Sequence, residues 1–433
     1  MIIKDRLFLK ITIFIFGTTI IFVSVFVLRN FCFEKNNLFN NFVSQLGNKE
    51  NDKFFLSGIN PNLLQEQNDF LENATTSINI NNEEDINLGS NFKSDYKNQL
   101  VHHLFNVYGV PSPKSLVFSK DGKEIWVSLL LNKRRGISVF DSLTGEKIKD
   151  INLDNGGGVE IIFSDNGNKA YVSQMETAKV LEIDAKSKEI LRVFNTGSTW
   201  TKMMTFSPDA EYLFASNWCG NNVSEIDLKT GELIRQIPTV RTPRGIYITK
   251  DGKTLYVAGF DKGEIEKIDL ETGLGEVIFE SGGAIRHIVA DEDKNILYVS
   301  DMGKNVIWKV LMENDKVEEF VKTDTNPNTI QLSPNKKILF VSCRGKNYSS
   351  TNYYIPGPEW GSVLLFDVET GKMLDAIIAG NQPTALDISP DGHLLIFSDF
   401  LDGRLEFFEI PSYEVLIQGD GGRSGVYKEE LQK

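Results

Sequence analysis

Residues 245–273 read GIYITKDGKTLYVAGFDKGEIEKIDLETG, and this stretch decides the fold. The apolar run at 246–248 predicts an inner strand, and the Asp-Gly pair that follows suits the positive φ angles of a tight hairpin. Residues 254–258 predict a second strand, residues 264–269 alternate as a third, and the Glu-Thr-Gly at the end turns toward a fourth. The stretch therefore predicts one four-stranded antiparallel sheet.

The same sequence motif recurs through most of the chain. The residues that open its first turn are Ser119, Ser164, Ser207, Thr249, Ala290, Ser333 and Ser389. They recur about every 43 residues, which is the period of a four-stranded propeller blade. The last interval is longer because it contains an insertion at 345–361. The sequence therefore predicts an all-β, seven-bladed β-propeller of four-stranded antiparallel blades over residues 99–419.

Two segments compete to close this ring as the outer strand of the seventh blade. Residues 100–108 have the pattern of a strand ahead of the first blade, and residues 414–418 have the pattern of a last strand after the final repeat. We favour the amino-terminal segment, because its distance from the first inner strand matches that of the fourth strands in the other repeats.

Two further positions repeat in register. A small residue near the end of each second strand predicts close packing between blades, and its members are Ser128, Ser173, Ser216, Ala258, Ser300, Ser342 and Ser398. Acidic residues recur after the third strands, at Asp141, Asp184, Asp227, Asp269 and Asp367. We interpret each Asp as the cap of its own turn through backbone amides, and not as one of a row of catalytic carboxylates.

These recurring sequence motifs resemble a known repeat. The Ser-Pro-Asp-Gly turns, with residues 255–258, 226–231 and 363–371, are similar to the YVTN-type β-propeller repeat family, which often occurs in bacterial and archaeal envelope proteins. The resemblance covers most of the chain, but most blades depart from the namesake tetrapeptide. It implies the architecture and leaves the function open, because this family includes surface antigens, binding modules and propellers related to lactonases and lyases.

The amino-terminal region sets the expected location. Residues 11–28 are apolar and uncharged, and they are just long enough to cross a bilayer. A cleavable signal peptide is the alternative, but no Ala-x-Ala-like site follows the run. Basic residues precede the span, which favours a cytoplasmic segment at 1–10 and a propeller on the extracytoplasmic side of the cell membrane. Residues 29–98 are Asn-rich and predict a flexible, disordered linker, and residues 420–433 predict a mobile carboxyl-terminal tail.

The net charge of the chain argues against one class of partner. Its formal net charge is −13, so no nucleic acid is expected. The loops that face the predicted channel mouth are mixed in charge, with acids beside a set of cations that includes Lys114, Lys202, Arg241, Arg244, Arg286, Arg344 and Arg404.

One apolar position on that face points to binding. Just beyond each second strand lie Leu130, Met175, Trp218, Phe260, Met302, Arg344 and Phe400, which we call the mouth ring. Apolar and aromatic groups with Arg at the margin are typical of a binding surface. The alternative is that each side chain packs over the neighbouring blade. The candidate binding residues are Trp200, Trp218, Phe260, Met302, Phe400, Arg244, Arg286, Arg344 and Trp360.

Catalysis has less support. His287 is the candidate acid or base, and Glu160, Asp301 and Asp399 are the candidate oxygen ligands of a divalent cation at the channel mouth. We favour a membrane-anchored, non-enzymatic binding module without a cofactor that recognises a protein or glycan partner in the cell envelope. One alternative is a cation-assisted lyase or lactonase-like hydrolase, and another is a spacer whose surface has no specific ligand.

Overall fold

The computed structural model describes residues 99–131, 135–154, 156–347, 354–419, 421, 425 and 427–433. The predicted cytoplasmic segment 1–10, the anchor 11–28 and the linker 29–98 lie outside the described residues. Within the part of the chain that the structure describes, we find no helix that is both long enough and apolar enough to cross a membrane.

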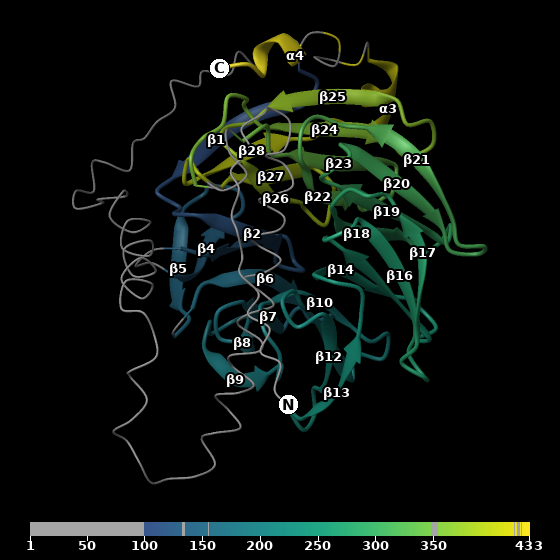
Figure 1. Ribbon diagram of the computed structural model, residues 1–433. Helices are drawn as coiled ribbons and strands as arrows, with labels where there is room; N and C mark the ends of the chain where they lie inside the picture. The colour runs from purple at the N-terminus through teal and green to yellow at the C-terminus, as the bar shows by residue number, and fades with distance from the viewer. Residues whose placement is uncertain are drawn as a thin grey trace, which may run out of the picture. The chain divides into compact units, whose positions relative to one another are not determined.

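Seven four-stranded antiparallel sheets are arranged around one axis, which confirms the predicted propeller (Figure 1). Blade one contains β2 (Pro113–Phe118), β3 (Glu124–Leu129), β4 (Gly136–Asp141) and β5 (Lys147–Asn152). Blade two contains β6 (Gly158–Phe163), β7 (Lys169–Gln174), β8 (Lys179–Asp184) and β9 (Ile190–Asn195). Blade three contains β10 (Thr201–Phe206), β11 (Tyr212–Asn217), β12 (Asn222–Asp227) and β13 (Leu233–Pro238).

The remaining blades continue the pattern. Blade four contains β14 (Pro243–Ile248), β15 (Thr254–Gly259), β16 (Glu264–Asp269) and β17 (Gly275–Glu280). Blade five contains β18 (Ile285–Asp291), β19 (Ile296–Asp301), β20 (Val306–Leu311) and β21 (Lys316–Lys322). Blade six contains β22 (Pro327–Leu332), β23 (Ile338–Cys343), β24 (Ser362–Asp367) and β25 (Met373–Ile378). Blade seven contains β26 (Pro383–Ile388), β27 (Leu394–Asp399), β28 (Arg404–Glu409) and β1 (His102–Tyr108).

The amino-terminal strand closes the ring, as predicted. Strand β1 pairs antiparallel with β28, from His102 opposite Glu409 to Tyr108 opposite Arg404. The competing segment is a helix, α3 (Tyr413–Gln418), whose amino end is capped by the side chain of Ser412. A capping Ser followed by an acidic first turn favours a helix start, and this local signal decides against a fifth strand in the last blade.

Turn chemistry holds the hairpins as the sequence predicts. In blade one, the hydroxyl of Ser119 donates to Asp121 over 2.7 Å, and Gly122 takes the positive φ of 75° that the turn requires. The repeated Asp residues each accept hydrogen bonds from backbone amides of their own turns, as Asp141 does from Leu143 and Thr144. The capping interpretation of these carboxylates is therefore confirmed.

The repeated small residue does more than allow close packing. The hydroxyl of Ser216 accepts the amide hydrogen of Met203 in its own blade, at 3.1 Å, and donates to the carbonyl of Arg244 in the next blade, at 2.8 Å. Ser173 does the same between blades two and three, where it donates to the carbonyl of Lys202 at 2.6 Å. These serines therefore join neighbouring inner strands by hydrogen bonds at the level where the candidate site begins.

The hydrophobic core is divided into layers between adjacent blades. One layer combines Trp126 and Val139 of blade one with Ile161 and Val172 of blade two, and all four are buried. Trp126 meets Phe163 edge-on, with 5.3 Å between the ring centroids. Burial of apolar area contributes roughly 25 cal/mol per Å², so these shared layers hold each blade to its neighbours and fix the spacing of the inner strands.

The carboxyl-terminal residues are held against blade six, where a mobile tail was expected. Helix α4 (Tyr427–Glu430) and α3 lie beside β25 (Figure 1). Tyr427 is fully buried, and its hydroxyl donates to Asp324 at 3.0 Å. A buried aromatic ring with a satisfied hydroxyl stabilises this contact, which polar composition alone did not reveal.

Candidate functional site

One backbone pattern builds the channel mouth. The residue just before an inner strand adopts positive φ at Ser112, Trp200, Thr242, Asn326 and Gln382. Its carbonyl then accepts the amide hydrogen of the mouth-ring residue in the same blade, as Trp200 does from Trp218 at 2.9 Å. This bond ties the loop after the second strand to the start of the inner strand. The mouth ring therefore sits directly over the first residues of the inner strands.

The mouth ring is packed inward. Phe400 and Leu130 are buried, while Trp218, Phe260 and Met302 are partly buried. The rings of Trp218 and Phe260 contact each other, with 4.7 Å between centroids. Phe400 and Leu130 pack with Val159 in one buried cluster, as the packing interpretation expects. Trp218, Phe260 and Met302 keep part of their surface exposed, as a binding role requires.

Cations occupy the second residue of four inner strands. They are Lys114 in β2, Lys202 in β10, Arg244 in β14 and Arg286 in β18. Together with Arg344 of the mouth ring, we call them the cation cluster. Blades two, six and seven carry Val159, Asn328 and Thr384 at this position. Because the inner strands surround one axis, the same register position brings these side chains to the same level of the channel.

Aromatic rings support three members of the cluster. The ammonium of Lys202 lies 5.1 Å from the ring centroid of Trp200 and 5.5 Å from that of Trp218. The guanidinium of Arg244 lies 5.7 Å from the Trp218 ring. On blade one, the ammonium of Lys114 lies 5.4 Å from the ring of Phe400, which belongs to blade seven. Such contacts each stabilise a cation by about 0.5–2 kcal/mol.

Neutral polarisable groups contact the other members. Arg286 lies 3.5 Å from the sulfur of Met302, and Arg344 donates to the side-chain oxygen of Gln382. The mouth-ring residues Trp218, Phe400 and Met302 therefore contact all four cations of the inner strands. The aromatic and cationic residues that the sequence singled out separately form one structure.

The positive charges of the cation cluster repel one another, which disfavours the protonated form of its lysines. Burial, followed by the charges of Arg286, Arg244 and Arg344, holds the pKa of Lys114 well below its usual value. Burial, followed by the charges of Arg244, Lys114 and Arg286, lowers the pKa of Lys202 in the same way. The direction in both cases is that of a crowded, partly desolvated positive cluster.

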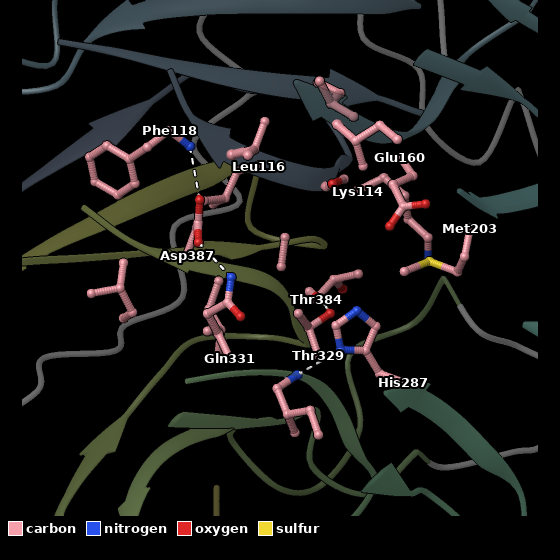
Figure 2. A pocket seen from close by; sticks show the side chains of 18 of the residues that line it. Lys114, Leu116, Phe118, Glu160, Met203, His287, Thr329, Gln331, Thr384 and Asp387 are labelled. Atoms are coloured by element: carbon pink, nitrogen blue, oxygen red, sulfur yellow. Dashed lines mark hydrogen bonds between the residues drawn. The ribbon is translucent and has the colours of Figure 1, made fainter. Parts of the chain in front are cut away.

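Three members of the cluster, Lys114, Arg244 and Arg286, line a cavity of about 480 Å³ along the channel. Figure 2 shows Lys114 and Glu160 on one side of this cavity, with His287, Thr329 and Thr384 together on another. The lining contains two acids, Glu160 near the mouth and Asp387 toward the other end, where Asp387 accepts from the amide of Phe118 at 2.9 Å.

Glu160 and His287 both join neighbouring inner strands. A carboxylate oxygen of Glu160 accepts the amide hydrogen of Met204, and burial raises the pKa of this carboxyl to about 8. The Nδ1 atom of His287 accepts the amide hydrogen of Ile330 at 3.4 Å. Burial, and then the charges of Arg244 and Arg286, lower the pKa of His287 to about 4. His287 is therefore neutral at pH 7.

The three candidate metal ligands have separate partners. Asp301 accepts from the amide of Ala284 at 2.9 Å and from the indole of Trp308 at 3.0 Å. Asp399 pairs with Arg404 at 2.7 Å. Glu160 lies on the inner strand of another blade. Across the described residues, no group of three or more His, Cys, Asp or Glu side chains is placed to hold a metal ion.

Trp360 belongs to a neighbouring site. Its amide donates to the carbonyl of Leu431 at 2.8 Å, and the ammonium of Lys433 lies 4.3 Å from its ring centroid. The carboxyl-terminal residues therefore cover Trp360, while the other candidate binding residues gather at the channel mouth.

Lys114 and Lys202 were predicted only as part of the mixed charge of the mouth loops, and not as binding residues. The signal that could have identified them is their register, because both follow the first residue of an inner strand, as Arg244 and Arg286 do. An alignment of the seven internal repeats at this position shows four cations in seven blades.

Comparison with known proteins places this architecture among relatives. No family model matches the chain, so membership of the YVTN repeat family stays a prediction. Antigen Lp49 of Leptospira interrogans serogroup Icterohaemorrhagiae serovar copenhageni is 33% identical over 307 residues, which cover 68% of this chain and 67% of that protein. The uncharacterised protein YncE of Salmonella typhimurium is 26% identical over 92 residues, or 21% of this chain and 26% of that protein.

A solved structure shares the fold. The chain resembles a chain of Kuenenia stuttgartiensis hydrazine synthase with a TM-score of 0.60 and 18% sequence identity, over 74% of this chain and 98% of that one. At this identity the likeness shows the fold alone.

Proposed function

We propose that this chain, which belongs to the same protein family as Antigen Lp49 of Leptospira interrogans, is a non-enzymatic binding module. Its partner is a protein or glycan of the cell envelope, received at the channel mouth. The observation that carries this proposal is the joint arrangement of the mouth ring and the cation cluster. Aromatic and Arg side chains that are held in place by the fold are the residues that dominate binding surfaces.

The contacts at the mouth support preorganisation. Trp218 touches Phe260 and lies under both Lys202 and Arg244, so its ring is fixed before a partner arrives. Side chains that are already ordered lose less conformational entropy on binding. Trp200 keeps a positive φ of 61°, which is costly for a bulky residue, and such strain is concentrated at functional positions.

The location of the protein is part of this proposal. Residues 11–28 would anchor it in the cell membrane with the propeller on the extracytoplasmic side. The designation of the relative as an antigen supports a place where the chain meets other macromolecules. Membrane fractionation of the full chain and of a variant lacking residues 1–28 tests the anchor. Recovery of the full chain in the soluble fraction after an alkaline wash would contradict it.

Partner capture tests the binding face. The full chain and a Trp218→Ala, Phe260→Ala variant are crosslinked in envelope extract, and a glycan array is probed with the same two proteins. A Leu143→Ala, Leu274→Ala variant is the control, because both residues are exposed apolar side chains in turns between third and fourth strands, away from the mouth.

We expect a partner that the parent and the control capture and the Trp218/Phe260 variant loses. Circular dichroism and thermal unfolding confirm that all three proteins are folded. Equal capture by all three would place binding elsewhere on the propeller and overturn the assignment of this face.

A further inference from the structure

We propose that the cation cluster is a binding site for a multivalent oxyanion, with Lys114, Lys202, Arg244 and Arg286 as its principal ligands. This inference rests on the proposed binding function and names the chemistry that the mouth recognises. The bound group carries phosphate or at least two carboxylates.

The first support is convergence. The four residues lie far apart in sequence, yet they share the second position of their inner strands and meet at one level of the channel. Three of them, Lys202, Arg244 and Arg286, come from adjacent blades. Lys114, Arg244 and Arg286 also line the cavity, whose 480 Å³ is within the range of small-molecule sites.

The second support is the surroundings of the cations. The rings of Trp218 and Phe400 lie against Lys202, Arg244 and Lys114, and the sulfur of Met302 lies 3.5 Å from Arg286. The nearby acids include Glu160, which lines the cavity, and Glu176, whose charge acts on Lys202. Burial and the charges of the neighbouring cations outweigh Glu176, so the pKa of Lys202 stays well below its usual value.

The third support is the positioning of the backbone. The hydroxyls of Ser173 and Ser216 bond the carbonyls of Lys202 and Arg244, respectively. The main chain that carries these two cations is thereby fixed to the preceding blade. Lys202, Arg244 and Arg286 are themselves more than nine-tenths buried, so the side chains converge on the mouth without a large entropic cost on binding.

The chemistry of the donors selects the ligand. Guanidinium groups bind planar or tetrahedral oxyanions through paired N–H donors, and ammonium groups add a compact positive charge. Several cations together favour a ligand with more than one negative charge, because such an ion relieves more of their mutual repulsion. A monovalent halide has neither the charge nor the acceptor geometry.

The test uses the full chain with citrate and inorganic phosphate as separate probes, in isothermal titration calorimetry at pH 6.5 and constant ionic strength with chloride as background. We expect saturable binding of at least one probe. The variants Arg244→Gln and Arg286→Gln should each weaken it at least tenfold, because each removes one charged ligand.

A charge-matched control separates a site from general attraction. The control variants are Lys229→Met and Lys253→Met, which replace exposed lysines in turns at the opposite end of the strands. Each variant should keep its affinity for the probe within twofold of the parent. Thermal unfolding of each variant verifies folding. Loss of affinity in the Arg variants but not in the controls supports the site. Failure of both probes to bind the parent, or equal loss in all variants, overturns it.

The outcome of the oxyanion titration can be distinguished from the outcome of partner capture. If a probe binds and no partner is captured, the oxyanion is a free ligand and the macromolecular part of the proposed function fails. If a partner is captured and the probes compete for it, the oxyanion belongs to that partner. If a partner is captured through Trp218 and Phe260 while neither probe binds or competes, the proposed function stands and the oxyanion site is refuted.

Discussion

Replacing Glu160 by Gln should stabilise the protein at alkaline pH and do little at acidic pH. The carboxyl lies in the channel with a pKa of about 8, raised from 4.5 chiefly by burial. Above pH 4.5 the unfolded chain releases this proton while the folded protein retains it. Folding is therefore penalised increasingly as the pH rises from 4.5, until the folded carboxyl also ionises near pH 8.

The magnitude follows from the size of the shift. One pKa unit corresponds to about 1.4 kcal/mol, so the penalty should increase by about 3 kcal/mol between pH 5 and pH 8. Gln retains a side-chain oxygen that accepts the amide hydrogen of Met204, so the link between blades two and three is kept. The substitution removes the charge and preserves the geometry.

The assay is urea unfolding of the parent and of Glu160→Gln at pH 5 and pH 8 in chloride buffers. The difference in free energy of unfolding should grow by about 3 kcal/mol in favour of the variant, with unchanged denaturant dependence. Glu271→Gln, in an exposed turn, is the control and should show no such growth. A difference for Glu160→Gln that stays constant between the two pH values would refute the reasoning.

Three further changes test other parts of the structure. Trp200→Asn should leave the free energy of unfolding unchanged or raise it by up to about 1 kcal/mol, because Asn tolerates positive φ and this gain offsets the lost aromatic contact. Urea unfolding measures this, and a decrease in the free energy of unfolding would contradict it. Ser300→Ala should lower the free energy of unfolding by about 1–3 kcal/mol, because the Ser300 hydroxyl donates a hydrogen bond to the carbonyl of Asn328 in the next blade at 2.9 Å. An unchanged urea midpoint would argue against this interblade role. Tyr427→Phe should lower the free energy of unfolding by about 1 kcal/mol, because the hydrogen bond to Asp324 is lost. It should also speed amide hydrogen exchange in the carboxyl-terminal residues, and equal exchange in both proteins would show that this bond does not hold the segment.

Part of the candidate site was predictable from single residues. Trp218, Phe260 and Phe400 were identified because apolar residues are unusual in loops, and the structure places them at the channel mouth. Arg244 and Arg286 were identified on the same face. Lys114 and Lys202 were not, because a lysine near a loop resembles an ordinary solvated residue until its neighbours in space are known.

The sequence by itself determined the period, the turn types, the number of blades and the strand that closes the ring, because these depend on local turn chemistry and on spacing along the chain. Only the tertiary structure decided which side chains meet. Ring closure brings Lys114 within electrostatic range of Arg286 across the channel, and it seats Tyr427 against blade six. Such contacts join residues that are distant in sequence, and their energies depend on burial and on charge separation, which no local pattern records.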